Sequence, residues 1–318
     1  SARGYLRLGS LAREAYGSFS AVLAQTSDAQ RLAGCGAPSP QVLGNLKFDV
    51  ELASAKLTLG ERFREAAGPR PVILAASTRE GEEAPLLDAF TRHAPPETLL
   101  VLVPRHPQRF DEVAALVEAR GLTLARRSAG EAIPADARVW LGDSMGEMLA
   151  YYRMSDLAII GGSWQPLGGQ NLIEACALGI PVLVGRHTFN FAEAAEKAIS
   201  AGAAKRCKDL DTALSVAVAL LRDPRRLAAM GEAGCAFAEA NRGATERTLA
   251  AISNLMRKNT SAPQPETLEQ APEPYSPALQ KFRAKRRRPA PTRNPWQRRY
   301  RPARSFTPRG KKAIQSAP

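Results

Sequence analysis

Residues 156–185 read DLAIIGGSWQPLGGQNLIEACALGIPVLVG. Two short apolar runs, at 156–162 and 180–185, flank a segment at 171–179 that has the spacing of a helix. Both runs are continuously apolar rather than alternating, which is typical of parallel strands covered on both faces. A strand, a helix and a second strand form the repeating unit of an α/β sheet, so this stretch predicts that fold class.

The same alternation extends over the preceding hundred residues. Further strands are predicted at 21–25, 71–77, 98–104 and 139–143, and helices at 81–93, 107–121 and 145–154. Three closing helices are predicted across 209–257. The sequence therefore predicts an open, doubly wound, parallel α/β sheet of the Rossmann-like kind.

Length and composition restrict the class of protein. The 318 residues suffice for about two domains, and their 44% hydrophobic content fits a globular core. No apolar run reaches the ~18 residues of a membrane-spanning helix, and the first residues lack the pattern of a signal peptide. The four cysteines have no CxxC spacing, so buried free thiols are expected: Cys35, Cys176, Cys207 and Cys235.

The net charge of +13 is concentrated at one end of the chain. Residues 261–318 hold 14 Lys and Arg against three acids, which leaves +2 for residues 1–260, and also 11 of the 24 prolines. Such a segment buries too little apolar surface to offset its ordering entropy, so disorder is predicted. Its arginines, with Trp296 and Tyr300, could bind nucleic acid or an anionic membrane, or form a plain solvated extension.

The first 60 residues contain too few predicted elements for an independent core. The chain has no initial Met and begins within a predicted helix at 2–16. We therefore expect a fragment, in which residues 1–60 end a preceding domain and its linker. Residues 61–257 are predicted to form the nucleotide-binding domain, and residues 258–318 the disordered tail.

Polar residues follow several predicted strands, where ligands bind in open α/β sheets. Ser77, Thr78 and Arg79 follow the strand at 71–77; they either cap the next helix or bind phosphate. Arg105 lies between Pro104 and Pro107, which favours a fixed basic site over a freely solvated side chain.

The segment LGDSMGEM (141–148) also ends a strand and begins a helix. Free amides at this helix start could bind a phosphate or a base carbonyl. Alternatively, this is an ordinary turn capped by Asp143 or Ser144, with Glu147 interacting with the helix dipole.

The loop after the strand at 156–162 is the most informative. Gly161 and Gly162 permit a tight exit from the strand, and Gly168 and Gly169 predict close approach of backbone to a ligand. Asn171 can cap the following helix, and Glu174 could accept hydrogen bonds from ribose hydroxyls. A capping box would explain these last two residues but not the glycines.

No GxGxxG motif, P-loop, HExxH motif or cysteine pair is present. The strand-end turns therefore indicate a nucleotide site that has neither an obvious nucleophile nor a metal cluster. No metal and no cofactor are expected.

Six segments in order resemble the Kdo (3-deoxy-D-manno-octulosonic acid) transferase family, specifically the C-terminal half of the lipid A Kdo transferases. They are GNLKFD (44–49), AASTREGEE (75–83), PRHPQRF (104–110), LGDSMGEM (141–148), GGSWQPLGGQNLIEA (161–175) and GIPVLVGRHTFNF (179–191). The resemblance implies the GT-B fold, with a remnant of the N-terminal acceptor domain. It also implies transfer of Kdo from CMP-Kdo to lipid A precursor in lipopolysaccharide biosynthesis, at the cytoplasmic face of the Gram-negative inner membrane.

The resemblance also implies roles for individual residues. Lys47 matches the lysine that stabilises the transition state, and Ser77 and Thr78 lie near the phosphate. The positions matched to CMP contacts are Pro104, Arg105, Met145, Gly146, Glu147, Asn171, Leu172, Ile173 and Glu174.

Three departures accompany the match. Arg79 and Gln170 stand where the family commonly has histidine, and the N-terminal segment that carries the family's catalytic base, a glutamate, is absent. The chain alone is therefore expected to bind CMP but to turn over poorly. Two other functions stay open: a nucleotide-sugar 2-epimerase, and a nucleic-acid- or membrane-binding protein that acts through the tail and has a non-catalytic nucleotide domain.

Overall fold

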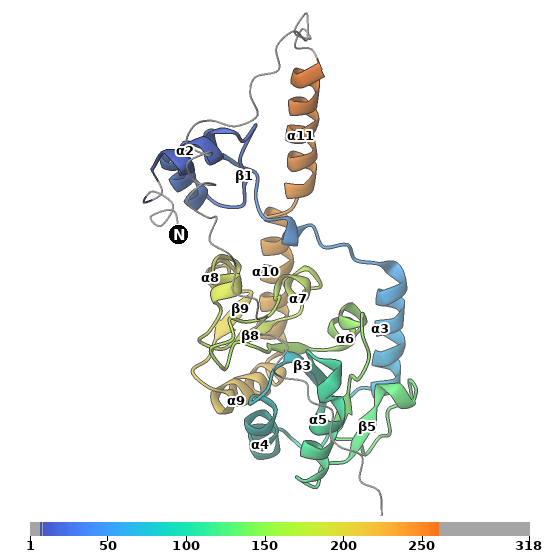
Figure 1. The fold of residues 1–318 in the computed structure, drawn as a ribbon. Coiled ribbons are helices and arrows are strands. Elements are labelled where there is room, and N and C mark those ends of the chain that lie inside the picture. Colours follow the sequence, from blue (N-terminus) through green and yellow to red (C-terminus); the bar gives the residue numbers. More distant parts are fainter. Residues whose placement is uncertain (1–6, 8, 261–318) are drawn as a thin grey trace, which may run out of the picture. The chain divides into compact units, whose positions relative to one another are not determined.

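A seven-stranded parallel sheet is the larger of the two sheets in the described residues (Figure 1). A computed structural model describes residue 7 and residues 9–260. Across the sheet, the strands are β5 (Leu124–Arg126), β6 (Val139–Leu141), β4 (Leu99–Pro104), β3 (Val72–Thr78), β7 (Leu157–Ile160), β8 (Val182–Val184) and β9 (Ala204–Arg206). All neighbouring strands pair in parallel. The predicted doubly wound parallel sheet is confirmed.

The first strand of this sheet in the sequence, β3, lies in the middle of the sheet. From β3 the chain proceeds outward through β4, and then returns to the other side of β3 to form β7. Such a reversal opens a crevice at the carboxyl ends of the strands, which is where ligands bind in this architecture.

Helices cover both faces of the sheet because alternate strand residues point to opposite sides. Val72, Leu74 and Ala76 contribute to one core, and Ile73 and Ala75 to the other. The first core is covered by α3 (Ser54–Ala67), α6 (Met148–Met154), α7 (Ile173–Ala177), α8 (Ala192–Ser200) and α10 (Pro224–Ala240). The second is covered by α4 (Glu83–His93), α5 (Phe110–Glu118) and α9 (Leu210–Leu221).

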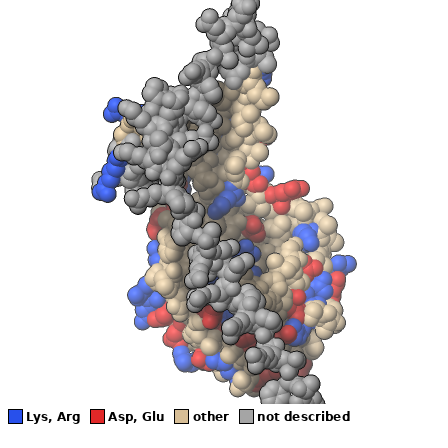
Figure 2. Space-filling model, in the orientation of Figure 1, with Lys and Arg blue, Asp and Glu red and all other residues tan. Residues whose placement is uncertain are grey.

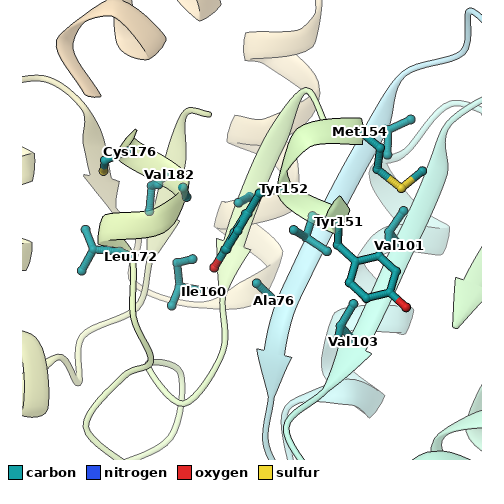
Figure 3. Close-up of a cluster of buried hydrophobic side chains, with 14 of the residues drawn as sticks. Ala76, Val101, Val103, Tyr151, Tyr152, Met154, Ile160, Leu172, Cys176 and Val182 are labelled. Carbon is teal, nitrogen blue, oxygen red and sulfur yellow. The ribbon is translucent and has the colours of Figure 1, made fainter. Parts of the chain in front are cut away.

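Aromatic packing orders the first core. Figure 3 shows part of it, in which Tyr151 and Tyr152 of α6 point toward strand residues such as Val103. The ring of Phe63 on α3 meets Trp140 edge-on at 4.9 Å between centroids and stacks on Tyr151 at 5.8 Å. These contacts fix α3 and α6 against the sheet.

Gly60 allows α3 to approach α6 closely. A Cβ atom added at this glycine would lie 2.6 Å from the Arg153 Cβ and 2.7 Å from the Ala150 carbonyl oxygen. We expect Gly60→Ala to lower the free energy of unfolding by about 1–3 kcal/mol, although alanine favours helix. Urea denaturation measures the loss. Gly34→Ala is the control, because no atom lies within 4 Å of its added Cβ; equal effects would contradict the prediction.

Several described elements are additional to those predicted. The edge strands β5 and β9 are three residues long, and β9 carries two cations, Lys205 and Arg206. Helices α3 and α8 were also not predicted. The three predicted closing helices are confirmed as α9, α10 and α11 (Ala244–Thr260).

Ahead of the 3-10 helix η2 (Leu46–Phe48), which precedes α3, the chain forms short elements outside the seven-stranded sheet. They comprise α2 (Ser10–Gly17), β1 (Leu23–Ala24), the 3-10 helix η1 (Ser27–Cys35) and β2 (Gln41–Val42), and β1 pairs with β2 in parallel. The predicted boundary between residues 60 and 61 lies inside α3. The division of the chain into domains stays a prediction, and the basic segment 261–318 lies outside the described residues.

Surface charge and cysteine exposure complete the description. On the face shown in Figure 2, acidic and basic side chains of the described residues are interspersed, in keeping with the small net charge of residues 1–260. Cys235 is exposed, so the prediction that all four thiols are buried is wrong for this residue; the other three are buried. Among the described helices, none is both long and apolar enough to cross a membrane.

Candidate nucleotide site

A cavity of about 510 Å³ lies at the carboxyl ends of the strands, near the point where the strand order reverses. Its walls come from the carboxyl ends of β3, β4 and β6, from the start of α7 and from the loop before α3. Nine of the predicted site residues line it: Lys47, Ser77, Pro104, Arg105, Met145, Gly146, Glu147, Asn171 and Glu174. Residues from five separate segments therefore converge on one space.

Three predicted site residues do not line this cavity. Leu172 and Ile173 are almost fully buried in the core beneath it. Thr78 is buried in β3, and its Oγ1 has no hydrogen-bond partner among the described residues. The side chains of Leu172 and Ile173 therefore support the wall of the site through packing and do not line the cavity.

Lys47 is held from several directions. Its backbone N–H donates to Asn45 Oδ1 at 3.0 Å, and the next residue, Phe48, is buried edge-on against Phe237 at 5.3 Å. The Lys47 ammonium lies 4.1 Å from the centre of the Phe191 ring, a favourable cation–π geometry. The amine therefore occupies a defined position at the cavity.

Ser77 has an unusual backbone conformation at the end of β3. Its φ of 56° makes it the one non-glycine residue with positive φ among the described residues, and such backbone strain gathers at functional sites. The capping alternative for Ser77 and Thr78 is wrong, because both lie in β3 and α4 begins after Glu82. The Thr78 carbonyl instead accepts from the Arg105 N–H at 2.9 Å, which joins two walls of the cavity.

The turn after β6 is organised by arginines that the sequence analysis missed. Arg127 donates to both carboxylate oxygens of Glu147, at 3.0 and 3.1 Å, and Ser144 donates to the same carboxylate. Burial opposes ionisation, but these donors hold the pKa of Glu147 below its usual value. Glu147 is thus an ion-pair partner, and the predicted dipole role does not describe its contacts.

Asp143 has an equivalent arrangement. Its carboxylate accepts from the N–H of Ser128 at 2.7 Å, from the Ser128 hydroxyl at 2.6 Å and from Arg126 Nε at 2.7 Å. Burial raises the pKa of Asp143, yet the three donors outweigh it and lower that pKa overall. Asp143 ties β5 to β6 and is not the cap of α6.

Asn171 and Glu174 form a local pair at the start of α7. Asn171 Oδ1 accepts from the Ile173 N–H at 3.0 Å, but the N-cap of α7 is Leu172 and no side chain caps this helix, so the predicted cap at Asn171 is wrong. Its amide donates to Glu174 Oε1 at 2.9 Å. Burial raises the pKa of Glu174, and the Asn171 amide partly opposes that increase. The pair presents a half-buried, oriented carboxylate to the cavity.

The glycines of the loop at 161–169 are explained by the protein's own packing. A Cβ at Gly161 would overlap the Ser77 carbonyl, and one at Gly168 would overlap the Asn190 side chain. Gly162, Gly168 and Gly169 also have positive φ. Neither Gly168 nor Gly169 lines the cavity, and close approach of a ligand to their backbone stays a prediction.

No group of three or more His, Cys, Asp or Glu side chains suited to hold a metal ion occurs in the part of the chain that the structure describes.

Known proteins resemble both the sequence and the fold. A family model described as 3-deoxy-D-manno-octulosonic-acid transferase (kdotransferase) matches residues 1–50. A 3-deoxy-D-manno-octulosonic acid transferase from Bordetella pertussis is 53% identical over 254 residues, which cover 78% of this chain and 59% of that protein. The chain spans about three fifths of the length of the curated relatives it matches first.

Two solved structures place the fold. The C-terminal CMP-Kdo binding domain of WaaA from Acinetobacter baumannii matches with a TM-score of 0.56 and 30% identity, over 58% of this chain and 98% of that one. A glycosyltransferase from Rickettsia africae matches with a TM-score of 0.51 and 14% identity, over 79% and 67%; this second likeness concerns the fold alone.

The parallel sheet, its strand order and these likenesses define a GT-B glycosyltransferase fold with a Rossmann-like C-terminal domain. With 53% identity to one Kdo transferase and a match to nearly all of the WaaA domain, the chain belongs to the Kdo transferase family.

Proposed function

We propose that this chain binds CMP-Kdo in the strand-end cavity and contributes the donor side of Kdo transfer to a lipid A precursor. The single observation that carries the proposal is the convergence of nine predicted site residues on one cavity of about 510 Å³. The name of the WaaA domain, whose full length the chain nearly covers, supports CMP-Kdo as the donor.

Each wall of the cavity has a chemical task in this proposal. Arg105 and the strand-end turn at Ser77 bind the phosphate. The turn at 144–147 contacts the base, and Glu174 accepts hydrogen bonds from the ribose hydroxyls. The Lys47 ammonium, near the Phe191 ring, faces the position where charge develops during transfer.

Transfer proceeds by direct displacement. An acceptor hydroxyl attacks the anomeric carbon of Kdo while the bond to the CMP phosphate breaks, and negative charge grows on that phosphate. Lys47 and Arg105 are placed to stabilise this charge without reorganising. A positioned base must remove the hydroxyl proton, and the proposal assigns that task to no residue of the cavity.

The acceptor and its location complete the proposal. A lipid A precursor lies in a membrane, so the proposed site of action is the cytoplasmic face of the inner membrane, with the chain as a peripheral protein. Family membership supports this location.

Titration of the 318-residue chain with CMP in a calorimeter tests the donor site. We expect saturable binding, weaker binding of UMP, and an affinity for CMP that falls with added salt because charged contacts are screened. Arg105→Ala should weaken CMP binding about tenfold, or about 1.4 kcal/mol, and leave cytidine binding unchanged. Absence of heat with CMP, or equal loss for CMP and cytidine, would contradict the assignment.

A further inference from the structure

Glu82 is a buried carboxylate to which the proposed reaction gives no role. Its side chain is 1% exposed and lies beneath the loops that border the cavity. Oε2 accepts from the N–H groups of Arg79 at 2.9 Å and Gly162 at 2.8 Å, and Oε1 accepts from the Trp164 N–H at 3.0 Å. One carboxylate therefore holds two turns that are 80 residues apart in the sequence.

Each of these turns leads directly into a wall of the cavity. On one side, Arg79 follows the strained Ser77. On the other, the Gly162 carbonyl accepts from the Gly169 N–H at 2.7 Å, and the Gly161 carbonyl accepts from the Gln170 N–H at 3.1 Å. Gln170 lines the cavity beside Asn171. The hydrogen bonds thus connect Glu82 to the phosphate side and to the ribose side of the site.

The two turns also touch directly. Gly161 packs so closely on the Ser77 carbonyl that no side chain fits between them. A residue held at positive φ needs surrounding structure to maintain it. The Glu82 hydrogen bonds, which secure both turns at once, supply that constraint.

We propose that Glu82 is a positioning residue: its buried carboxylate sets the separation between the Ser77–Arg79 turn and the Gly162–Gln170 loop, and thereby the width of the donor site. The inference rests on the proposed function, because the width matters only if a nucleotide binds there. Glu82 itself contacts no ligand in this proposal.

Glu83 provides a matched control. It is the next residue, is also 1% exposed, and carries a carboxylate. Its partner is Arg109, at 2.6 Å from Nη1 to Oε1, and among the described contacts its carboxylate accepts from neither turn. Removing its charge therefore perturbs a buried carboxylate of α4 without releasing the two turns.

The experiment compares Glu82→Gln with Glu83→Gln in the 318-residue chain. In Glu82→Gln one carboxylate oxygen becomes an NH2 group that faces an N–H donor, so at least one hydrogen bond is lost. We expect faster amide hydrogen exchange at Arg79, Gly162 and Trp164, and a CMP dissociation constant raised on the order of 10- to 100-fold. Both variants lower the melting temperature, but Glu83→Gln leaves these amides and the CMP affinity unchanged.

Several outcomes would overturn the inference. Unchanged CMP affinity in a folded Glu82→Gln protein, despite a lower melting temperature, would reduce Glu82 to a stabilising residue. Unchanged exchange at the three amides would show that the carboxylate does not hold the turns. If Glu82→Gln does not fold, amide hydrogen exchange in the wild-type protein tests the proposal instead. Exchange at Gly162 and Trp164 that is as fast as at the exposed Gln165 would contradict it.

The proposed function fails separately. If the wild-type chain does not bind CMP, the donor-site assignment is contradicted, whereas hydrogen exchange in Glu82→Gln, measured without ligand, still reports whether Glu82 links the two turns.

Discussion

Arg109→Leu should lower the free energy of unfolding by about 3–5 kcal/mol, a larger loss of stability than that expected of Gly60→Ala. Arg109 donates to both oxygens of the buried Glu83 carboxylate, at 2.6 and 3.2 Å. Without Arg109, a carboxylate that is 1% exposed keeps its charge without a partner or must take up a proton. Urea denaturation of the two proteins, followed by circular dichroism, measures the difference.

Glu112→Gln is the control for this effect. Glu112 bonds to the same arginine, with Arg109 Nη2 to Oε1 at 2.9 Å, but its side chain is largely exposed. Exposed ion pairs contribute little, so this variant should lose much less stability than Arg109→Leu. Replacing both buried partners, with Glu83→Leu added to Arg109→Leu, should restore part of the loss. Comparable losses in Arg109→Leu and Glu112→Gln would contradict the argument.

Glu174→Ala should weaken CMP binding about 30- to 150-fold. The proposed hydrogen bonds from the two ribose hydroxyls to an ionised carboxylate contribute about 2–3 kcal/mol. The effect should depend on those hydroxyls, so 2′,3′-dideoxy-CMP should bind the wild-type protein and Glu174→Ala with similar affinity. Calorimetric titration of the two proteins with each of the two ligands gives the four dissociation constants of a thermodynamic cycle.

Acidity gives an independent check on the same contact. Burial raises the pKa of Glu174, so its carboxylate becomes protonated at a higher pH than an ordinary glutamate and then accepts more weakly. The ratio of the dideoxy-CMP dissociation constant to the CMP dissociation constant should therefore decrease as the pH falls. Protonation of the phosphate does not affect this ratio, because both ligands carry the same phosphate. Glu118→Ala, which removes an exposed carboxylate at the end of α5 and outside the cavity lining, should change neither ligand's affinity. A preference that is independent of pH would contradict the role of Glu174.

The sheet could be predicted from sequence because its information is local. Each central strand is a continuous apolar run, and segments such as 98–104 and 156–162 need no distant partner to be recognised. β9 was not predicted because Lys205 and Arg206 interrupt the apolar pattern of a strand that is only three residues long. Short edge strands are defined by pairing with a neighbour, which composition does not reveal.

The site was predictable in its position but not in its internal contacts. Strand-end turns identified the cavity, since parallel strands bring their carboxyl ends to one edge. The bond from Glu82 to Gly162 spans 80 residues, and that from Arg127 to Glu147 spans 20. No short motif records such a pairing. The run of glycines has a packing reason that no short motif shows: a side chain at Gly168 would overlap Asn190, which lies elsewhere in the sequence but is adjacent in the fold.

The segment that carries Lys47 is bonded to the start of α11, almost 200 residues later in the sequence. Asp49 accepts from the N–H groups of Gly243 and Thr245, both at 2.6 Å, and so joins this segment to the start of α11. Together with Phe48 against Phe237, these bonds hold Lys47 against the part of the chain that carries the proposed donor site. For the proposed donor site, we therefore expect the distance between the Lys47 ammonium and CMP to be set by contacts within this part of the chain alone.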